Sequence, residues 1–360
     1  MKTVAEFKIH YRQILGPAGE VVAPLPSFAQ DPDEVLRMYE AMTLVRVFDA
    51  KAVNLQRTGQ LGTYPSCLGH EAAHIGVGAA MRAEDVLAPV YREFGTQLWR
   101  GVTMTEILTY WGGDERGNDF AVPRHDFAWC VPIATQTLHA AGAAMAFKVR
   151  KEPRCALAYI GDGGTSEGAF YEALNLAGSR ALPVVFVIVN NGWAISVPVA
   201  AQTAAQTLAQ KAVSAGIPGV QVDGNDVFAV RTVVGEALEA ARRGAGPSLI
   251  EALTYRLSDH TTSDDASRYR PADEVKAAWA LEPLLRIREF LINGGVWDAA
   301  KEQALLQECT LQIDAAVTAY LGAAKPSSDA MFDHLFAAMP KHLHEQRRTA
   351  RKYGAKHSSQ

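Results

Sequence analysis

A glycine-rich segment, Gly161-Asp162-Gly163-Gly164, directly follows the apolar run 155–160, and a helix-forming stretch begins within the next few residues. Glycines let backbone N–H groups approach an anion closely, and the N-terminus of a helix adds a partial positive charge. Because Asp162 would repel a bare phosphate, the segment favours a divalent cation between its carboxylate and phosphate oxygens. It matches neither the P-loop pattern nor the dinucleotide-binding pattern.

A second polar turn, Asn190-Asn191-Gly192, ends the next apolar run at 183–189. The interval between the two turns is long enough for one helix and one return strand of a βαβ unit. Either turn alone is most often an ordinary turn. Together, at the carboxyl ends of neighbouring parallel strands, they predict a site for Mg²⁺ built from a carboxylate, an Asn oxygen and a backbone carbonyl.

The elements that must position these turns are short apolar strands with helices between them. The runs 155–160, 183–189 and 247–255 are rich in β-branched residues and bounded by turn residues. Continuous apolar strands that alternate with helices predict an α/β fold with a parallel sheet covered on both faces. Apolar spacing predicts an amphipathic helix over 33–57.

Three regions are expected along the chain. Residues 1–32 carry repeated Gly and Pro and are interpreted as an extended N-terminal arm, and 33–325 form the α/β domain. Residues 326–360 form a C-terminal segment whose basic tail is interpreted as solvated. The Ala- and Gly-rich stretches 69–81 and 137–150 predict helices that pack closely in the core or at a subunit interface.

Composition restricts the class of protein. The chain has 360 residues, 48% of them apolar, which is enough for a large core, and its formal net charge of −4 gives no general reason to bind nucleic acid. Its four cysteines lack the CxxC spacing of a zinc site. The longest apolar run is too short to span a bilayer, and the first residues do not resemble a signal peptide. We expect a cytoplasmic protein.

The segment 258–270 is rich in Ser, Thr and Asp, has no apolar periodicity, and is expected to be exposed and mobile. A histidine on such a loop, His260, is by default a surface residue. Beside a phosphate site, however, an imidazole that titrates near neutral pH is suited to donate a proton or to contact an anion. His70, His74 and His139 lie in small-residue helices and are interpreted as packing or supporting residues.

Six segments in order give the chain a family resemblance: "LGHEA" (68–72), "YREFG" (91–95), "GDGGTSEGAFYEALNLAG" (161–178), "NNGWAISVPV" (190–199), "TLAQKAVSAGIPGVQVDGND" (207–226) and "YRLSDHTTSDDASRYRP" (255–271). They resemble the alpha subunit of the thiamine diphosphate-dependent decarboxylating component of bacterial 2-oxo acid dehydrogenase complexes, most closely the pyruvate dehydrogenase type. The resemblance covers nearly the whole chain and implies the thiamine diphosphate-binding fold.

The resemblance also implies site residues. The Mg²⁺ ligands would be Asp162, Asn191 and the backbone carbonyl of Trp193. The residues that contact thiamine diphosphate would be Tyr91, Arg92, Gly163, Gly164, Arg256 and His260, with the backbone of Val131 to Ile133 against the aminopyrimidine ring. His260 would be the catalytic residue, on a loop that the family orders over the entrance to the active site.

Partners follow from the same resemblance. The glutamate that activates the cofactor comes from a beta subunit in this family, so the implied enzyme is a heterotetramer of two alpha and two beta subunits. It decarboxylates a 2-oxo acid and passes the acyl unit to the lipoyl group of an acyltransferase component.

Three alternatives stay open at this point. The first two are the alpha subunits of branched-chain 2-oxo acid (3-methyl-2-oxobutanoate) dehydrogenase and of acetoin dehydrogenase. The run "HTTSDD" (260–265) resembles some branched-chain members, whereas Asp162 and Val189 stand where such members often have Glu and Arg. The third is a non-catalytic binding or scaffold subunit, and the intact Asp162, Asn191, Arg92 and His260 argue against it.

Overall fold

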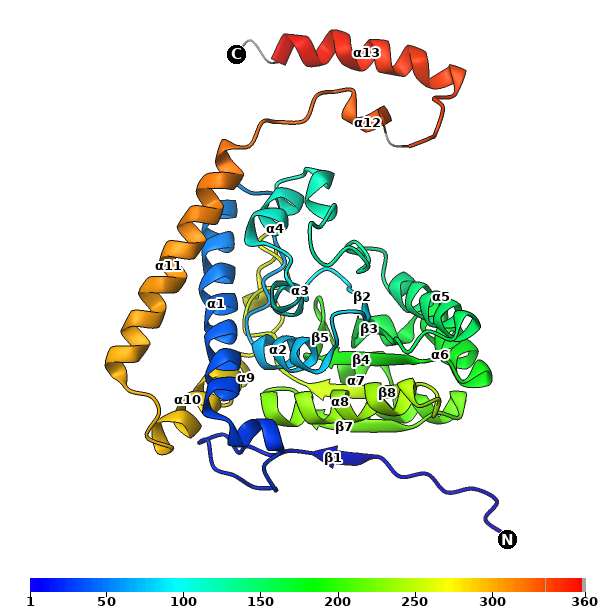
Figure 1. Cartoon of the computed structure of the whole chain (residues 1–360), viewed down its shortest axis with the longest axis vertical. Coiled ribbons are helices and arrows are strands. Elements are labelled where there is room, and N and C mark those ends of the chain that lie inside the picture. Colours follow the sequence, from blue (N-terminus) through cyan, green and yellow to red (C-terminus); the bar gives the residue numbers. More distant parts are fainter. Residues whose placement is uncertain (334, 358–360) are drawn as a thin grey trace.

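A single parallel sheet lies at the centre of the molecule (Figure 1). The computed structural model describes residues 1–333 and 335–357. The strands of this sheet, in spatial order, are β1 (His10–Arg12), β7 (Gly219–Asp223), β8 (Ser248–Leu253), β4 (Val184–Asn190), β3 (Ala156–Gly161) and β2 (Val86–Ala88). All five pairings between these neighbours are parallel. The predicted α/β fold is confirmed, and the three predicted strands are β3, β4 and β8.

Helices cover both faces of the sheet because successive side chains of the central strands point to opposite sides. Leu157 and Tyr159 pack into a core shared with α1 (Pro32–Arg57), α2 (Glu71–Ala80) and α8 (Val227–Arg242). Ala158 and Ile160 pack into a second core with α5 (Thr135–Arg150) and α6 (Gly168–Arg180). The predicted helices at 33–57, 69–81 and 137–150 are thus confirmed as α1, α2 and α5.

The remaining helices complete the body and its C-terminal extension. Those of the body are α3 (Phe94–Arg100), α4 (Met104–Trp111), α7 (Val199–Gln202), α9 (Ala272–Trp279), α10 (Pro283–Asn293) and α11 (Ala299–Gly322). Helix α11 runs alongside α1 (Figure 1). No helix within the described residues is long and apolar enough to cross a membrane.

The N-terminal residues join the body through one edge of the sheet. β1 pairs with β7, and the backbone N–H groups of Ile14 and Leu15 both donate to the buried carboxylate of Asp226. Residues 1–8 are exposed. The first 32 residues are therefore extended only at their start, and from residue 10 onward they supply an edge strand and core side chains.

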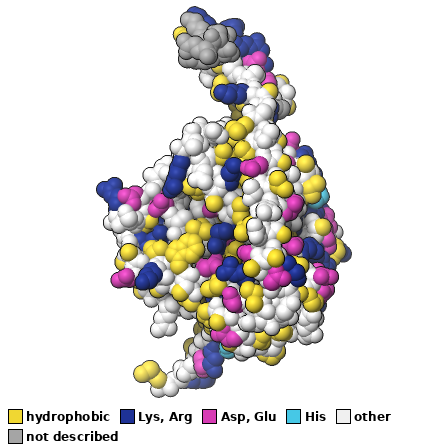
Figure 2. Space-filling view, turned by 90° about the vertical axis from the view of Figure 1, so that its left-hand side faces the viewer, with side chains coloured by type: hydrophobic (Ala, Val, Ile, Leu, Met, Phe, Trp, Pro, Cys, Tyr) yellow, Lys and Arg dark blue, Asp and Glu magenta, His cyan; other side chains and the backbone are white. Residues whose placement is uncertain are grey.

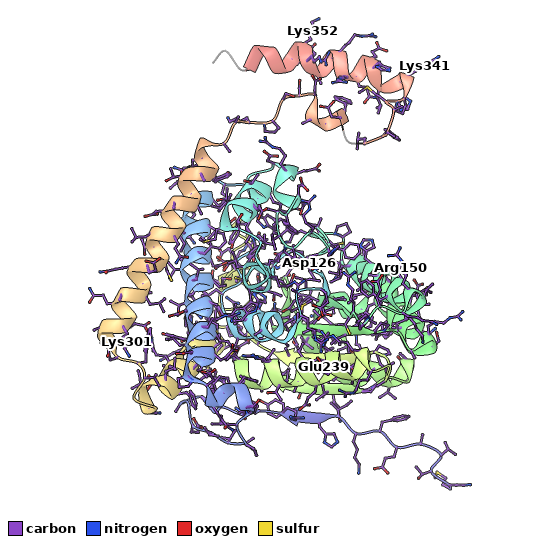
Figure 3. All side chains as sticks on the ribbon, viewed as in Figure 1. Asp126, Arg150, Glu239, Lys301, Lys341 and Lys352 are labelled. Atoms are coloured by element: carbon purple, nitrogen blue, oxygen red, sulfur yellow. The ribbon has the colours of Figure 1, made fainter. Side chains whose placement is uncertain are left out.

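The C-terminal segment lies apart from the α/β body. Helices α12 (Ala330–Asp333) and α13 (Lys341–His357) sit beyond the end of α11 (Figure 1), and the chain projects there and at the N-terminus (Figure 2). Arg347 and Arg351 both pair with Asp329, at 2.9 and 2.7 Å. The side chains of Lys341 and Lys352 point away from the body (Figure 3). Residues 334 and 358–360 of the predicted segment lie outside the described residues.

Candidate active site

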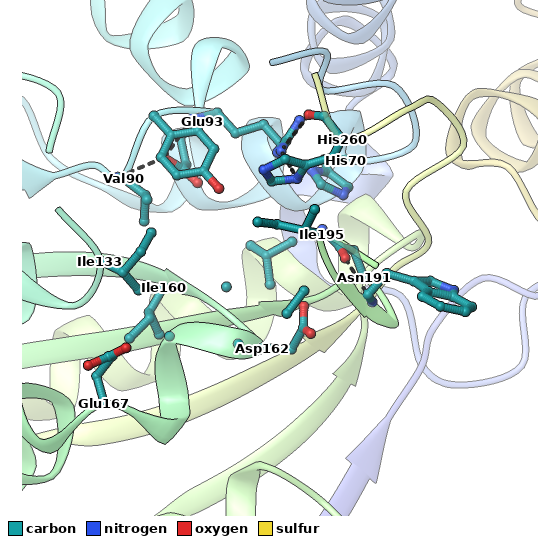
Figure 4. Close-up of a pocket in the computed structure, with 18 of the residues that line it drawn as sticks. His70, Val90, Glu93, Ile133, Ile160, Asp162, Glu167, Asn191, Ile195 and His260 are labelled. Atoms are coloured by element: carbon teal, nitrogen blue, oxygen red, sulfur yellow. Dashed lines mark hydrogen bonds between the residues drawn. The ribbon is translucent and has the colours of Figure 1, made fainter. Parts of the chain in front are cut away.

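A cavity of about 250 Å³ opens at the carboxyl ends of β3 and β4 (Figure 4). Its lining includes nine of the residues expected from the sequence: Tyr91, Arg92, Ile133, Asp162, Gly163, Gly164, Asn191, Trp193 and His260. Two expected residues, Val131 and Arg256, are not in the lining. Ligands of open parallel sheets bind at this edge, so the cavity is the candidate active site.

The predicted metal ligands follow two adjacent strands. Asp162 comes directly after β3 and is 2% exposed, and one of its oxygens, Oδ2, accepts a hydrogen bond from Gln202 Nε2 at 2.9 Å. Burial raises the pKa of the Asp162 carboxyl, while hydrogen bonds from Gln202 and from backbone N–H groups act in the opposite direction. Asn191 comes directly after β4, and its Oδ1 accepts from the backbone N–H of Trp193 at 3.2 Å.

These donors fit Mg²⁺ in chemical type. A buried carboxylate, an amide oxygen and a backbone carbonyl are hard ligands, and each oxygen keeps a lone pair beyond its present hydrogen bond. Only one of the three is charged. Accordingly, the described part of the chain contains no group of three or more His, Cys, Asp or Glu side chains that could hold a metal. Such an ion would complete its coordination shell with phosphate oxygens and water.

The two glycines of the turn leave no room for side chains. A Cβ added at Gly163 would lie 2.5 Å from the Cβ of Ala194, and one added at Gly164 would lie 2.7 Å from Cγ1 of Ile160. Helix α6 begins at Gly168, shortly after the turn. Backbone N–H groups and a helix N-terminus therefore lie at the same end of the cavity, as the sequence predicts.

The opposite wall of the cavity is basic. Arg92 is 6% exposed; its Nη1 donates to the backbone carbonyl of Ser66, and its Nη2 donates to the carbonyl of His260 at 3.0 Å and approaches His260 Nδ1 at 3.2 Å. A guanidinium can only donate, so Nδ1 of His260 accepts and the ring proton lies on Nε2. Burial, then Arg92 and Arg256, lower the pKa of His260 to about 3. The imidazole is therefore neutral at neutral pH.

Arg256 lies behind this wall and connects it to the metal side. The fully buried guanidinium donates to the backbone carbonyls of Trp193 at 3.1 Å and Ile195 at 2.7 Å, and to the Tyr269 hydroxyl at 2.9 Å. Burial is the largest cause that lowers its pKa. The carbonyl of Trp193, a predicted metal ligand, thus accepts a hydrogen bond from a cation in this structure.

The expectation of an exposed loop at 258–270 is wrong in part. Ala266 is 2% exposed and begins a short 3₁₀ helix, and Arg270 is buried and donates to the carbonyl of Arg256. Asp264 accepts from the backbone N–H of His260 at 2.9 Å and from the Tyr269 hydroxyl at 2.5 Å. Polar contacts within the loop, and with Tyr64 and Arg92 far away in the chain, give the loop an order that apolar periodicity cannot reveal.

Sequence reasoning missed four polar residues that line the cavity: His70, Glu93, Gln136 and Glu167. Burial raises the pKa of Glu93 to about 7, although its carboxylate accepts from the backbone N–H groups of Val90 and Arg92. Glu93 lies inside the "YREFG" segment, so its place beside Arg92 was a usable signal. Gln202, the partner of Asp162, had no such signal because forty residues separate them.

Comparison with known proteins agrees with this geometry. Residues 39–327 match the family model described as "Dehydrogenase E1 component". The 3-methyl-2-oxobutanoate dehydrogenase subunit alpha of Mycobacterium tuberculosis is 46% identical over 292 residues, which are 81% of this chain and 80% of that protein.

Two relatives whose names give pyruvate as the substrate are also similar. The pyruvate dehydrogenase E1 component subunit alpha of Acholeplasma laidlawii is 42% identical, covering 89% of this chain and 94% of that protein. The subunit of the same name from Staphylococcus aureus is 38% identical, covering 94% and 92%. The sheet, the strand-end cavity and these similarities lead to one conclusion: the chain belongs to the dehydrogenase E1 component family, as a chain of the alpha-subunit type.

Proposed function

We propose that the chain is the alpha subunit of pyruvate dehydrogenase (acetyl-transferring), and that it binds thiamine diphosphate and Mg²⁺ in the strand-end cavity. One observation carries the proposal. The oxygen donors of Asp162, Asn191 and Trp193 and the basic wall of Arg92 and His260 line a single cavity. A diphosphate with a divalent cation is the ligand that needs both walls at once.

The chain's residues would divide the work of holding this ligand. The three oxygen donors would hold Mg²⁺, and Arg92 with Tyr91 would hold the diphosphate through charge and a phenol donor. The apolar side chains of Val90 and Ile160, which also line the cavity, would exclude water from its other end. When bound, thiamine diphosphate supplies the electron sink for the loss of CO₂ from the 2-oxo acid.

His260 would deliver a proton or a hydrogen bond during acyl transfer. Its Nδ1 accepts from Arg92, so the free donor of the neutral ring is Nε2–H. A neutral imidazole beside two guanidiniums is suited to gain a proton when an anion enters the cavity, because an anion offsets the repulsion that lowers its pKa.

We also propose that the chain works with a beta subunit, as a heterotetramer of two copies of each, and that the acyl unit passes to a lipoyl group of an acyltransferase. Exposed apolar side chains near the cavity support an interface there: Val131, Ile133, Ile195 and Val197 are each between 43% and 55% exposed. The beta subunit would supply the activating glutamate. All four cysteines are free, which agrees with the cytoplasmic location that we propose.

The second candidate function is the branched-chain alpha subunit, favoured by the 46% identity to the mycobacterial protein. The nature of residue 189 favours pyruvate, because Val189 lines the cavity in the position where branched-chain members often have Arg. Acetoin is the third substrate to test.

The test is a rate comparison on the purified chain assembled with its beta subunit. Pyruvate, 3-methyl-2-oxobutanoate and acetoin are compared by kcat/KM, with thiamine diphosphate and Mg²⁺ present. We expect pyruvate to be preferred by about tenfold or more, since a pocket fitted to a smaller substrate discriminates on that scale per added group. A preference for the branched substrate would move the assignment to the second candidate. Cofactor binding without turnover of any substrate would favour a non-catalytic subunit.

A further inference from the structure

One polar side chain in the cavity has no role in the proposed function. His70 lines the cavity and is 1% exposed, and its Nε2 has no hydrogen-bond partner within the described residues. It is the residue that precedes α2, yet its side chain does not cap that helix. Buried polar atoms are nearly always hydrogen-bonded, so an unpaired nitrogen at a cavity wall points to a partner that arrives with a ligand.

The backbone around His70 is firmly held. Gly69 has a φ of +95°, and a Cβ at that position would lie 2.2 Å from the carbonyl oxygen of Tyr255. The buried carboxylate of Glu71 accepts from the backbone N–H of Gly69 at 3.0 Å and from Arg46 Nε at 2.5 Å. The backbone at His70 is therefore held by a turn that only glycine allows and by the ion pair between Glu71 and Arg46.

The charges around His70 keep its ring uncharged. Burial lowers its pKa well below the ordinary value, and His74, Arg92 and Arg256 lower it further. A neutral imidazole has one N–H donor and one acceptor nitrogen. In a wall that already contains Arg92 and His260, the group that suits it is an anionic oxygen.

We propose that His70 is a ligand-binding residue, whose imidazole N–H donates to an anionic oxygen held at the basic wall. That oxygen belongs to a phosphate of the cofactor or to the carboxylate of the 2-oxo acid. The proposal rests on the proposed function and deepens it. It differs from the sequence-based interpretation of His70 as a packing or supporting residue.

The chain offers a matched control in His74. This residue lies one turn along α2, is fully buried, and has two nitrogens without partners within the described residues. Its ring contacts that of His70 edge-on, at 5.7 Å between centroids. It is not part of the cavity lining. Substitution of His74 therefore changes packing and burial in the same helix without removing a donor from the cavity.

The experiment compares His70→Phe, His70→Gln and His74→Phe with the wild type, each assembled with the beta subunit. Two constants are measured: the Kd of thiamine diphosphate at saturating Mg²⁺, from quenching of tryptophan fluorescence, and the KM of pyruvate at saturating cofactor. If the oxygen is a phosphate, His70→Phe should raise the Kd by about 10- to 100-fold. If it is the carboxylate, the Kd should be unchanged and the KM should rise on the same scale.

In either case His70→Gln, which keeps an N–H donor, should recover much of the loss, and His74→Phe should resemble the wild type. If His70→Phe changes neither constant more than His74→Phe does, or if Gln is no better than Phe, the proposal is wrong. Should His70→Phe not fold, the smaller His70→Leu takes its place under the same criteria. A wild-type protein that fails to bind thiamine diphosphate would overturn the proposed function itself, which separates the two failures.

Discussion

The two walls of the cavity are built at different distances from the strands that support them. On the metal side, Asp162 and Asn191 each come directly after a strand, and those strands are paired in register from Ala156–Val184 to Gly161–Val189. On the basic side, Arg92 and Arg256 follow the flanking strands β2 and β8 by three or four residues, and His260 follows by seven. The central sheet fixes the first wall, whereas hydrogen bonds between distant side chains fix the second.

This difference predicts how each wall fails. A change on the metal side should remove ligand binding and leave the surrounding structure intact. A change on the basic side should loosen the wall itself, because Arg92, Arg256 and His260 hold one another and the loop at 258–270.

The largest effect is expected for Asp162→Ala. Loss of the one charged metal donor should lower the Mg²⁺-dependent affinity for thiamine diphosphate by about 100-fold or more. The fold should remain even though Asp162 is 2% exposed. Burial raises the pKa of its carboxyl, so the folded state gains little from this charge. Calorimetric titration and thermal unfolding measure the two effects.

Gln202→Ala is the control for Asp162→Ala, because it removes the hydrogen bond to Oδ2 and keeps the carboxylate. We expect an affinity for thiamine diphosphate within a few-fold of the wild type. Near-normal affinity in Asp162→Ala would contradict the assignment of this wall to a metal.

The next effect in size is expected for Arg256→Leu. The change removes donors to the carbonyls of Trp193 and Ile195 and to the Tyr269 hydroxyl, and so leaves buried acceptors unpaired. The loop at 258–270 should be cut faster by proteinase K, and the affinity for thiamine diphosphate should fall by about tenfold. Arg268→Leu, at an exposed position of the same loop, should have neither effect. Equal proteolysis of the two variants would show that Arg256 does not hold the loop.

The wild-type loop should itself respond to ligand. Ordering of a loop residue costs about 1–2 kcal/mol in backbone entropy, and an anion that engages Arg92 and His260 offsets part of that. Proteolysis at 258–270 should slow when thiamine diphosphate, Mg²⁺ and the beta subunit are present. The burial of Ala266 and the hydrogen bond from Arg270 to the carbonyl of Arg256 imply partial protection before any ligand is added. Identical cleavage rates with and without cofactor would argue against ligand-dependent order.

A smaller effect on affinity is expected for His260→Ala. The ring lies on the loop and contacts Arg92, which has other partners, so cofactor affinity should change only a few-fold. Acyl transfer to the lipoyl group should slow by about 100-fold, in the range of a lost proton donor. The rate of acyl transfer is measured in single-turnover experiments, and cofactor affinity is measured as the Kd of thiamine diphosphate, so that the two effects are separated. An unchanged transfer rate would mean that this histidine is not catalytic.

The same contrast explains what the sequence could predict. Gly-Asp-Gly-Gly and Asn-Asn-Gly directly follow apolar runs, so the metal side could be placed from strand ends alone. The strands β1, β2 and β7 were missed because each is short or partly exposed. Gln202, the order of the loop and the cavity-facing position of His70 depend on contacts between segments far apart in the chain. Local patterns do not encode such contacts.

The smallest effect is expected at His74, which lies in neither wall of the cavity. It concerns the pH dependence of the free energy of unfolding. Burial, and then Arg92, lower the pKa of His74 to about 3. Between that value and the ordinary pKa near 6.5, the unfolded chain binds a proton that the folded chain excludes, so stability should fall as the pH drops below about 6.5. At pH 5.5 this amounts to about 1 kcal/mol for one such histidine.

His74→Phe removes this proton uptake from the unfolded chain and keeps a ring of similar size beside Tyr159. The difference in unfolding midpoint between pH 7.5 and pH 5.5 should therefore shrink by about 1 to 2 °C relative to the wild type. Cofactor affinity at neutral pH should be unaffected, because His74 does not line the cavity. An unchanged pH dependence would mean that His74 already takes up its proton in the folded state. Its burial would then not exclude the charge.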